Sequence, residues 1–512
     1  MAAPDQQFSS ITECLEAACE TRFDLELFCD PRERLTGREV RQDVEQIAAG
    51  LWSAGYRKGD VMAFLCTSSV RHAVTFYACL RIGLVPCALH VTDTEDRQSR
   101  TLHFIEAKAL ITDAALAEKA RAIWPDGPCL SLDGTGPDSV KALADKRRVP
   151  GPDPFFHQDD IALLLMSSGT TGDPKCVMHT VKSLAAMTPL AQVLYGCTSA
   201  KDSVAIVMSP AFAAWVITSF PMLGLNARFY FQGSFEPHRF LQILQEERIT
   251  LAPLVPTLWR LILEAGPEAY DLSAIKSVFY SGEPGSADLV SALKDKITPS
   301  ICTAFLASEG CAASAIAAGP EILLENQTLS AAAGRPVTTA SVRIVDPDGP
   351  IDQEVRDGEI GEIVLQSPSL AAGYLHKPEL TKEKFSDSWW RSGDLGLRDE
   401  NGILFVKGRT DNQINSGGVK VRAEEIENIL LQHTDISHAA VVGEPDDTWG
   451  ERIVAHVVSS SEDLTEHALL KNLKDKDLLP HRLVPKAVYF HAQLPRGATG
   501  KLYRRGLRRQ PK

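Results

Sequence analysis

A loop of small hydroxyl-bearing and glycine residues, closed by a lysine, is the segment of the chain best suited to chemistry. It follows the apolar run 163–166 and reads Ser167-Ser168-Gly169-Thr170-Thr171-Gly172-Asp173-Pro174-Lys175. Its backbone N–H groups, hydroxyls and ammonium group could together hold a polyphosphate, and glycine permits a close approach. Asp173 after Gly172 excludes a Walker loop, and the chain has no G-x-G-x-x-G dinucleotide fingerprint. The loop predicts polyphosphate binding, with an ordinary polar loop as the alternative.

Three later segments follow in an order that is typical of one large family. They are Trp390-Arg391-Ser392-Gly393-Asp394, Gly408-Arg409-Thr410-Asp411 and Pro495-Arg496-Gly497-Ala498-Thr499-Gly500-Lys501. With the loop, they resemble the motifs of the adenylate-forming superfamily, which comprises acyl-CoA synthetases, adenylation domains of peptide synthetases and luciferases. The resemblance covers nearly the whole chain. One departure is Cys176, which stands where the last glycine of the family's loop is usual.

The resemblance implies a two-step reaction of a carboxylic acid. Carboxylate and ATP first give an acyl-adenylate and pyrophosphate, and a thiol, usually that of CoA, then displaces AMP. Adenylation supplies the leaving group that a free carboxylate lacks, and holding two anions together requires cations and fixed dipoles. We therefore expect an AMP-forming acid–thiol ligase that uses ATP, Mg²⁺ and CoA and acts on a small carboxylic acid.

The resemblance assigns the phosphates to two lysines and to the loop. Lys501 would stabilise the α-phosphate and the attacking carboxylate during adenylation. Lys175 would hold the β- and γ-phosphates and the departing pyrophosphate. Taken alone, each would be read as a surface lysine. The remaining loop residues would bind the nucleotide: Ser167, Ser168, Gly169, Thr170, Thr171 and Gly172.

Segment 305–309, Phe-Leu-Ala-Ser-Glu, departs most from the family, which usually has Tyr-Gly-x-Thr-Glu. By position, Phe305 would stack on adenine and Ser308 would bond the α-phosphate. Glu309 would hold Mg²⁺, because this hard cation prefers carboxylate and phosphate oxygens. Without the other motifs, Glu309 would be read as an exposed carboxylate at the start of a helix.

Two further segments complete the nucleotide site that the resemblance implies. Ser281-Gly282-Glu283-Pro284 is similar to the family's adenine-side loop, and a plain turn is the alternative. Asp394 would bond both ribose hydroxyls, because a carboxylate has two acceptor oxygens. Arg409 would contact the ribose from the domain boundary. The resemblance thus adds Gly282, Glu283, Pro284, Asp394 and Arg409 to the nucleotide site.

The implied motion between the two half-reactions also has assigned residues. Asp411 occupies the family's hinge position, where a few backbone dihedrals change. Gly417 and Gly418 would lie in the glycine loop that the lid turns toward the thiol channel. Flexible surface glycines are the alternative for this pair.

The acid pocket is assigned to Ala213, Trp215, Trp259, Ser281 and Leu306. Ala213 is apolar where amino-acid-activating relatives carry an Asp, so the acid should lack an α-ammonium group. The two tryptophans lie in segments that resemble the family's pocket walls, and flat walls suit a small apolar or aryl body. Leu306 stands where most relatives have a glycine that lets a long acyl chain pass. It should shorten the pocket, unless it packs elsewhere.

The apolar patterns predict the elements that position these residues. Helices and strands alternate at first, which predicts α/β layers with largely parallel sheets. From about residue 340 strands and turns prevail, and after Arg409 the pattern restarts as a small α+β unit. The expected helices are 38–54, 70–82, 423–433 and 465–478, and the expected strands are 61–66, 85–90, 109–112, 160–166, 203–208, 276–280, 340–345, 361–365, 402–407, 436–442 and 453–459.

These elements predict an α/β protein of two domains. Residues 1–409 would form a large N-terminal domain of layered α/β sheets, with a β-rich subdomain at about 335–409. Residues 410–512 would form a small mobile α+β lid domain. No low-complexity linker separates them, so we expect a short hinge, with the active site between the domains.

Composition argues against several other classes. A net charge of −13 is unsuited to a general binder of nucleic acid or of anionic membranes. Eleven cysteines without metal-site spacing fit reduced thiols in a cytoplasm. No uncharged apolar run approaches about 20 residues, and the N-terminus lacks a basic region followed by an apolar one. We therefore expect neither a membrane span nor a signal peptide.

The acceptor of the acyl group stays open at the level of sequence. A free-standing adenylation enzyme that loads a carrier protein is the nearest alternative to an acyl-CoA synthetase. A catalytically retired nucleotide-binding protein is the alternative from another class, and the departures in segment 305–309 keep it open. Neither the identity of the acid nor the oligomeric state follows from these residues.

Overall fold

The computed structural model describes residues 8–134, 136–145, 156–167, 175–282, 285–310, 315–318, 332–416, 419–446, 449–461, 463–476, 478–480, 483–496 and 502–508. Contacts divide these residues into two compact units. The first unit holds the described residues up to Val342 together with Leu365–Trp390. The second holds Arg343–Val364 and the described residues from Arg391 onward. The predicted domain boundary at 409/410 stays a prediction.

The first unit contains a seven-stranded sheet that carries the strands of the phosphate loop. Strands β7, β4, β3, β5 and β6 are parallel, whereas β8 runs antiparallel to β7 and β18 antiparallel to β8. The order is β18 (Gly373–Tyr374), β8 (Lys175–Thr180), β7 (Ile161–Ser167), β4 (Val85–Ala88), β3 (Val61–Leu65), β5 (Ala109–Thr112) and β6 (Cys129–Ser131).

A second sheet in the same unit carries the predicted adenine-side segments. Its strands are parallel from β13 to β1 and antiparallel at both ends. The order is β15 (Ala332–Pro336), β14 (Ala315–Ala318), β13 (Ile301–Phe305), β12 (Ser277–Ser281), β11 (Leu251–Leu254), β9 (Ser203–Ile206), β10 (Arg228–Phe231), β1 (Glu26–Cys29) and β2 (Arg34–Thr36).

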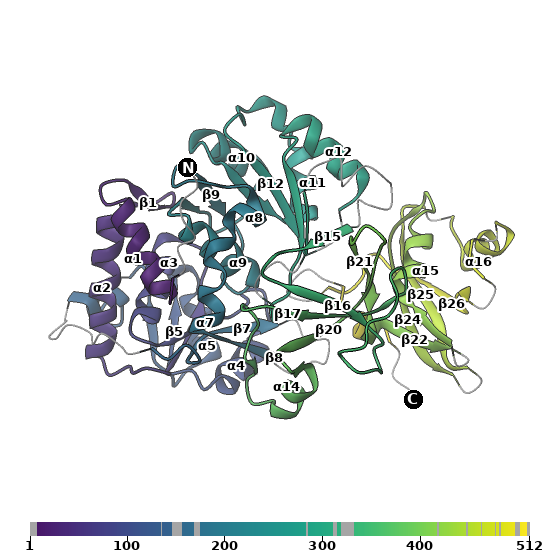
Figure 1. The fold of residues 1–512 in the computed structure, drawn as a ribbon, viewed down its shortest axis with the longest axis horizontal. Coiled ribbons are helices and arrows are strands. Elements are labelled where there is room, and N and C mark those ends of the chain that lie inside the picture. The colour runs from purple at the N-terminus through teal and green to yellow at the C-terminus, as the bar shows by residue number, and fades with distance from the viewer. Residues whose placement is uncertain are drawn as a thin grey trace. The chain divides into compact units, whose positions relative to one another are not determined.

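Helices cover both faces of these two sheets (Figure 1). Successive strand residues point to opposite faces, so Phe64 and Val204 enter one large core between the sheets, while Ala63 and Ala205 enter outer cores. The shared core holds α1 (Ile11–Thr21), α2 (Gly37–Ser53), α3 (Val70–Arg81) and α9 (Ala213–Gly224). The outer cores hold α4 (Glu95–Phe104) and α5 (Ala117–Ile123), and α10 (Pro237–Glu246), α11 (Pro256–Glu264) and α12 (Ala287–Lys296). Shorter elements of the first unit are α6 (Val140–Asp145), α7 (Val181–Ala185), α8 (Ala191–Tyr195), α14 (Pro378–Lys384) and β19 (Phe385–Ser386).

Local caps explain why two predicted helices begin where they do. The Thr36 side chain accepts from the Glu39 N–H while Glu39 bonds back to Thr36, a capping box that starts α2. Ser69 caps α3 by accepting from the N–H of His72. The predictions of helices at 38–54 and 70–82 are therefore confirmed within one residue.

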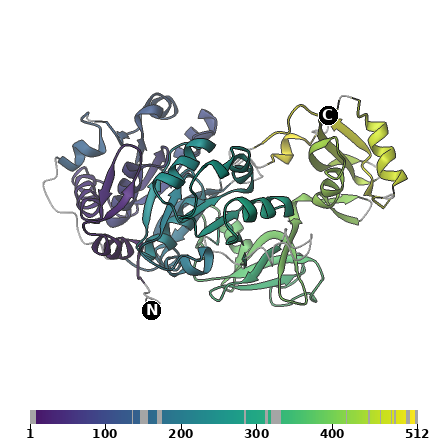
Figure 2. The same ribbon diagram turned by 90° about the horizontal axis from the view of Figure 1, so that it is seen from above.

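The second unit is rich in strands, as predicted from about residue 340. Four strands that lie wholly or mostly in this unit follow one another in the order β16 (Ser341–Val345), β17 (Gly361–Gln366), β20 (Trp389–Arg398) and β21 (Leu404–Arg409). A separate five-stranded sheet follows, with β22 (Gln413–Ser416), β23 (Val419–Arg422), β24 (Ile436–Asp446), β25 (Gly450–Ser459) and β26 (Ala487–Phe490). Helices α15 (Ala423–Leu430) and α16 (Glu466–Asp475) share one core with that sheet (Figure 2).

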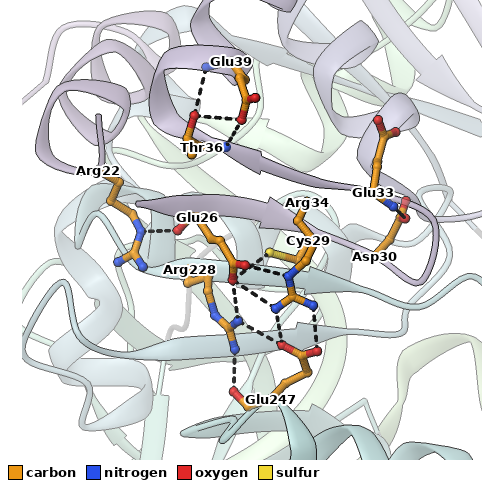
Figure 3. A network of polar contacts seen from close by, with 10 residues as sticks. All are labelled: Arg22, Glu26, Cys29, Asp30, Glu33, Arg34, Thr36, Glu39, Arg228 and Glu247. Atoms are coloured by element: carbon orange, nitrogen blue, oxygen red, sulfur yellow. Dashed lines mark hydrogen bonds and ion pairs between the residues drawn. The ribbon is translucent and has the colours of Figure 1, made fainter. Parts of the chain in front are cut away.

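A network of charges fastens the edge of the second sheet in the first unit (Figure 3). Arg228 on β10 contacts both Glu26 on β1, at 3.0 Å, and Glu247 at the end of α10, at 2.9 Å. Arg34 on β2 bonds the same two carboxylates. Hydrogen bonds from Arg34 lower the pKa of Glu26 to about 2 and lower that of Glu247. The ionised carboxylates therefore contribute stability above the ordinary pKa of glutamate.

Glu247→Gln is expected to lower the free energy of unfolding by about 1–3 kcal/mol near neutral pH. The change leaves the guanidinium of Arg228, whose side chain is only 14% exposed, with a weaker partner. Because Glu247 of the wild type has a lowered pKa and protonates only as pH falls below the ordinary glutamate value of about 4.5, the difference should shrink below that pH. Glu246→Gln, on the same helix but 54% exposed, is the matched control for urea unfolding at each pH. A difference from wild type that grows as pH falls would contradict this account.

Candidate active site

The strands on either side of the predicted phosphate loop are paired with each other. β7 ends at Ser167 and β8 begins at Lys175, and the antiparallel register places these two residues opposite each other. The two ends of the loop are therefore held together at the carboxyl edge of β7. The side chain of Ser167 and the residues Ser168, Gly169, Thr170, Thr171 and Gly172 lie outside the described residues, so their roles stay predictions.

Two residues that the sequence places far apart meet beside this loop. The Lys175 ammonium lies 2.9 Å from Glu309 Oε1. Glu309 is buried, with 7% of its surface exposed, so it is not the exposed carboxylate that a reading without the motifs would suggest. A charge-assisted pair of this kind puts the cation that is predicted to bind phosphate next to a carboxylate that suits Mg²⁺.

Hydrogen bonds hold the backbone around Glu309 from two directions. On one side, the Ala371 N–H donates to the Glu309 carbonyl at 2.8 Å, and the Ser369 hydroxyl donates to the Gly310 carbonyl at 2.7 Å. On the other side, His179 Nε2 lies 2.8 Å from the carbonyl of Ser308. The unusual segment 305–309 is thus fixed in position at Ser308 and Glu309.

His179 must donate its Nε2–H to that carbonyl, because a carbonyl only accepts. Burial lowers the pKa of His179 to about 4, so the ring is neutral near pH 7. From this position under the Ser308–Glu309 turn, His179 supports the backbone of the turn. No sequence motif predicts the contact between His179 and the Ser308 carbonyl. The only sequence signal for it is a histidine that follows the apolar residues of β8.

The adenine-side segments end at one edge of the second sheet. β12 ends at Ser281 and β13 ends at Phe305, and the two strands are parallel, with Ser281 opposite Ala304. Ligands of open α/β sheets bind at the carboxyl ends of such strands. Gly282 has a φ of +88°, in the left-handed region that favours glycine. Glu283 and Pro284 lie outside the described residues.

The residues assigned to the acid pocket differ in their surroundings. Ala213 begins α9, and Leu306 is half-buried against the core between the two sheets. Trp215 is fully buried, with its indole N–H 3.1 Å from Ser68 Oγ. Trp259 is also fully buried, in the outer core, with its N–H 3.2 Å from the Phe279 carbonyl. Each indole has a structural contact, and the pocket assignment stays a prediction.

A cavity of about 370 Å³ in the first unit lies at the other edge of the first sheet. It is lined by Val61, Val85 and Ile161, which are the first residues of β3, β4 and β7. The phosphate loop follows the last residue of β7. None of the residues assigned to the acid pocket lines this cavity, so it is a separate feature.

The predicted ribose residues meet within the second unit. Asp394 on β20 pairs in register with Arg409 on β21, and Arg409 Nη1 lies 2.9 Å from Asp394 Oδ1. Burial opposes the charge on Arg409, but the carboxylates of Asp394 and Asp411 outweigh it and raise the arginine pKa above its usual value. Gly393 has a φ of +72°, and a Cβ there would lie 3.2 Å from Arg409 Nη2. Glycine at this position therefore lets the arginine reach Asp394.

The predicted hinge residue and both ends of the segment with the predicted catalytic lysine lie in the second unit. Asp411 lies in a short 3₁₀ turn, Thr410–Asn412, and accepts from Arg409 Nε at 3.2 Å. Gly417, Gly418 and Lys501 lie outside the described residues. The two ends of the Lys501 segment are tied together, because Arg496 pairs with Leu502 and the Tyr503 N–H donates to the Pro495 carbonyl at 2.8 Å.

Comparison with known proteins identifies the family of the chain. Residues 15–375 match the AMP-binding enzyme family, and residues 425–501 match the AMP-binding enzyme C-terminal domain. The chain belongs to this family. The match of the C-terminal domain ends at Lys501, the residue to which the motifs assign catalysis.

Relatives of this AMP-binding enzyme are ligases of different acids. A feruloyl-CoA synthase from Amycolatopsis is 31% identical over 93% of this chain and 94% of its own. A long-chain fatty-acid–CoA ligase from Mycobacterium tuberculosis is 27% identical over 99% and 97%. The o-succinylbenzoate-CoA synthetase of Bacillus subtilis, solved with an acyl-adenylate, has the same fold, with a TM-score of 0.84 at 22% identity and coverage of 98% of each chain.

These comparisons confirm the predicted family, the α/β fold class and the reaction class. The enzyme is an AMP-forming acyl-CoA synthetase that uses ATP and CoA. The residues fit Mg²⁺, the expected metal, because Glu309 offers a buried carboxylate beside the cation of the phosphate loop. Among the described helices, none is long and apolar enough to cross a membrane.

Proposed function

We propose that this AMP-binding enzyme activates a short or branched aliphatic acid, or a compact aryl acid, and transfers the acyl group to CoA in the cytoplasm. The observation that carries the proposal is the contact between Lys175 and Glu309. It brings the cation of the phosphate loop and the predicted Mg²⁺ ligand to one place, where ATP phosphates would bridge them. The described cysteines are free thiols, as a reducing compartment requires.

Each half-reaction has its own residues in this proposal. Lys501, Lys175, Ser308 and Glu309 act in adenylation, on the α-phosphate, the pyrophosphate and the metal. Asp394 and Arg409 hold the ribose, and their register on β20 and β21 supports this role. Rotation at Asp411 then brings Gly417 and Gly418 to the thiol channel for CoA.

The substrate class rests on two features of the predicted pocket. Ala213 offers no carboxylate for an α-ammonium group, so the acid is not an amino acid. Leu306 follows β13 directly and is half-buried, so it supplies bulk beside the segment that holds Glu309. The feruloyl-CoA synthase relative takes its name from an aryl acid. Because another relative takes its name from long-chain fatty acids, the chain length that this enzyme accepts is the property that most needs measurement.

A panel of acids incubated with ATP, Mg²⁺ and CoA tests the proposal. Acyl-CoA should form from butyrate, a branched short acid, benzoate or a hydroxycinnamate, and poorly from chains beyond about eight carbons, where the pocket no longer gains about 0.8 kcal/mol per buried CH₂. Preference for palmitate over butyrate and benzoate would contradict the substrate class. A holo carrier protein used in preference to CoA would favour the free-standing adenylation enzyme.

Leu306→Gly is expected to extend the usable chain length of the acid. If Leu306 closes the pocket, its removal makes room for about four further carbons, since a leucine side chain has four. The measurement is kcat/KM for acids of increasing length, with Leu306→Met as a control of similar volume. An unchanged length profile in the glycine variant would show that the pocket is limited by other residues.

A further inference from the structure

We propose that Tyr374 is a positioning residue for the metal-binding carboxylate of Glu309. The inference rests on the proposed role of Glu309 in holding Mg²⁺. The Tyr374 hydroxyl lies 3.0 Å from Glu309 Oε1, and the Trp390 indole N–H lies 3.3 Å from the same hydroxyl. An indole only donates and a carboxylate only accepts, so the hydroxyl accepts from Trp390 and donates to Glu309.

The same tyrosine contacts both members of the charge pair. Its ring centroid lies 4.1 Å from the Lys175 ammonium, while its hydroxyl bonds the carboxylate. When ATP phosphates draw Lys175 away, the hydroxyl keeps its hold on Glu309. Lys175 and Tyr374 both contact Oε1 of the carboxylate that would hold the metal.

The backbone fixes Tyr374 in relation to the phosphate loop. In β18, Tyr374 pairs with Val177 of β8, the strand that begins with Lys175. The Tyr374 N–H donates to Thr381 Oγ1 at 2.9 Å. The preceding Gly373 has a φ of +139°, and a Cβ there would lie 2.3 Å from Thr381 Cγ2. Glycine at position 373 is therefore required for this close approach to Thr381.

One segment of the chain, residues 371–374, contacts both the backbone and the carboxylate of Glu309. The Ala371 N–H bonds the Glu309 carbonyl, and three residues later the Tyr374 hydroxyl bonds its carboxylate. The two aromatic residues of this hydrogen-bond chain are buried, with 2% of Tyr374 and 3% of Trp390 exposed. Water therefore has little access to these hydrogen bonds, and they fix the orientation of the carboxylate before the metal arrives.

Tyr374→Phe isolates the hydroxyl, because phenylalanine keeps the ring under Lys175. ATP binding is measured by calorimetry, first in EDTA and then at a series of Mg²⁺ concentrations. We expect unchanged ATP affinity in EDTA and an increase of about tenfold in the Mg²⁺ concentration needed for tight ATP binding, as for other residues that orient metal ligands. The Mg²⁺ requirement of adenylation should rise in parallel.

Tyr195→Phe is the matched control. Tyr195 is equally buried, and its hydroxyl donates to the Ile217 carbonyl at 2.9 Å in the core between the sheets. It should lose stability without changing the Mg²⁺ requirement. The inference is overturned if Tyr374→Phe leaves the requirement unchanged, or if Tyr195→Phe raises it equally. Should Tyr374→Phe not fold, Trp390→Phe must raise the requirement in the same direction, and no rise overturns the inference.

Glu309→Gln separates this inference from the proposed function. If Glu309→Gln raises the Mg²⁺ requirement and Tyr374→Phe does not, Tyr374 has no positioning role and the proposed function stands. If Glu309→Gln also leaves the requirement unchanged, Glu309 does not hold the metal, and both the assigned role of Glu309 and this inference fail.

Discussion

Lys501→Ala is expected to slow acyl-adenylate formation by about 10²–10³-fold or more, while thioester formation from supplied acyl-adenylate stays near the wild-type rate. The reason is electrostatic: the ammonium group would stabilise charge on the α-phosphate and the attacking carboxylate only in the first step. The segment is held at its ends by the Arg496–Leu502 pairing, so alanine should leave the lid fold intact. The two half-reactions are measured separately, by ATP–pyrophosphate exchange and by CoA consumption with synthetic acyl-adenylate.

Lys474→Ala is the matched control for the loss of a lid lysine. Lys474 is exposed on α16 and is assigned no role in either half-reaction. This variant should keep both rates. If Lys501→Ala converts supplied acyl-adenylate as poorly as it converts the acid, Lys501 does not act in the first step alone. The proposal that the lid changes position between the two half-reactions would then be wrong.

Asp411→Pro should retain adenylation and lose most of thioester formation. Proline fixes φ near −65° and restricts the residue before it, so the dihedrals at Thr410 and position 411 can no longer change between the half-reactions. Asp411 lies in the 3₁₀ turn Thr410–Asn412, and the φ range usual for such a turn, about −50° to −70°, is compatible with proline. Single-turnover kinetics of each half-reaction give the loss of rate in adenylation and in thioester formation separately.

Asp411→Ala controls for the lost side chain. It removes the hydrogen bond from Arg409 Nε at 3.2 Å but leaves the backbone free to rotate. Both half-reactions should continue in this variant. Equal losses in the two half-reactions of Asp411→Pro would point to unfolding or to a hinge at another residue.

The local elements could be predicted because their signals are local. The strand at 109–112 coincides with β5, and the predicted helix at 70–82 exceeds α3 by one residue. The helix predicted at 465–478 is longer than α16, which ends at Asp475, because the apolar residues beyond it, such as Leu478, pack against the lid core without being helical. Periodicity reports which side chains are buried, and a helix and the turn after it can bury them equally.

The contacts that build the site could be predicted only in part. The motifs indicated that Lys175 and Glu309 both serve the nucleotide, and the structure brings them together across 134 residues of chain. Tyr374 escaped notice, because its hydroxyl reaches Glu309 across 65 residues and nothing in the sequence near either residue encodes that pairing. The burial of Trp259 could not be foreseen either, since an indole in an amphipathic helix such as α11 suits a core or a pocket wall equally.

ATP–pyrophosphate exchange across the acid panel tests most directly whether the site built around Lys175 and Glu309 performs adenylation. The account predicts that exchange depends on the acid and on Mg²⁺ and that it occurs without CoA. It also predicts loss of exchange in Glu309→Gln. Binding of ATP without acid-dependent exchange for any acid of the panel would contradict the account and indicate a retired nucleotide-binding protein.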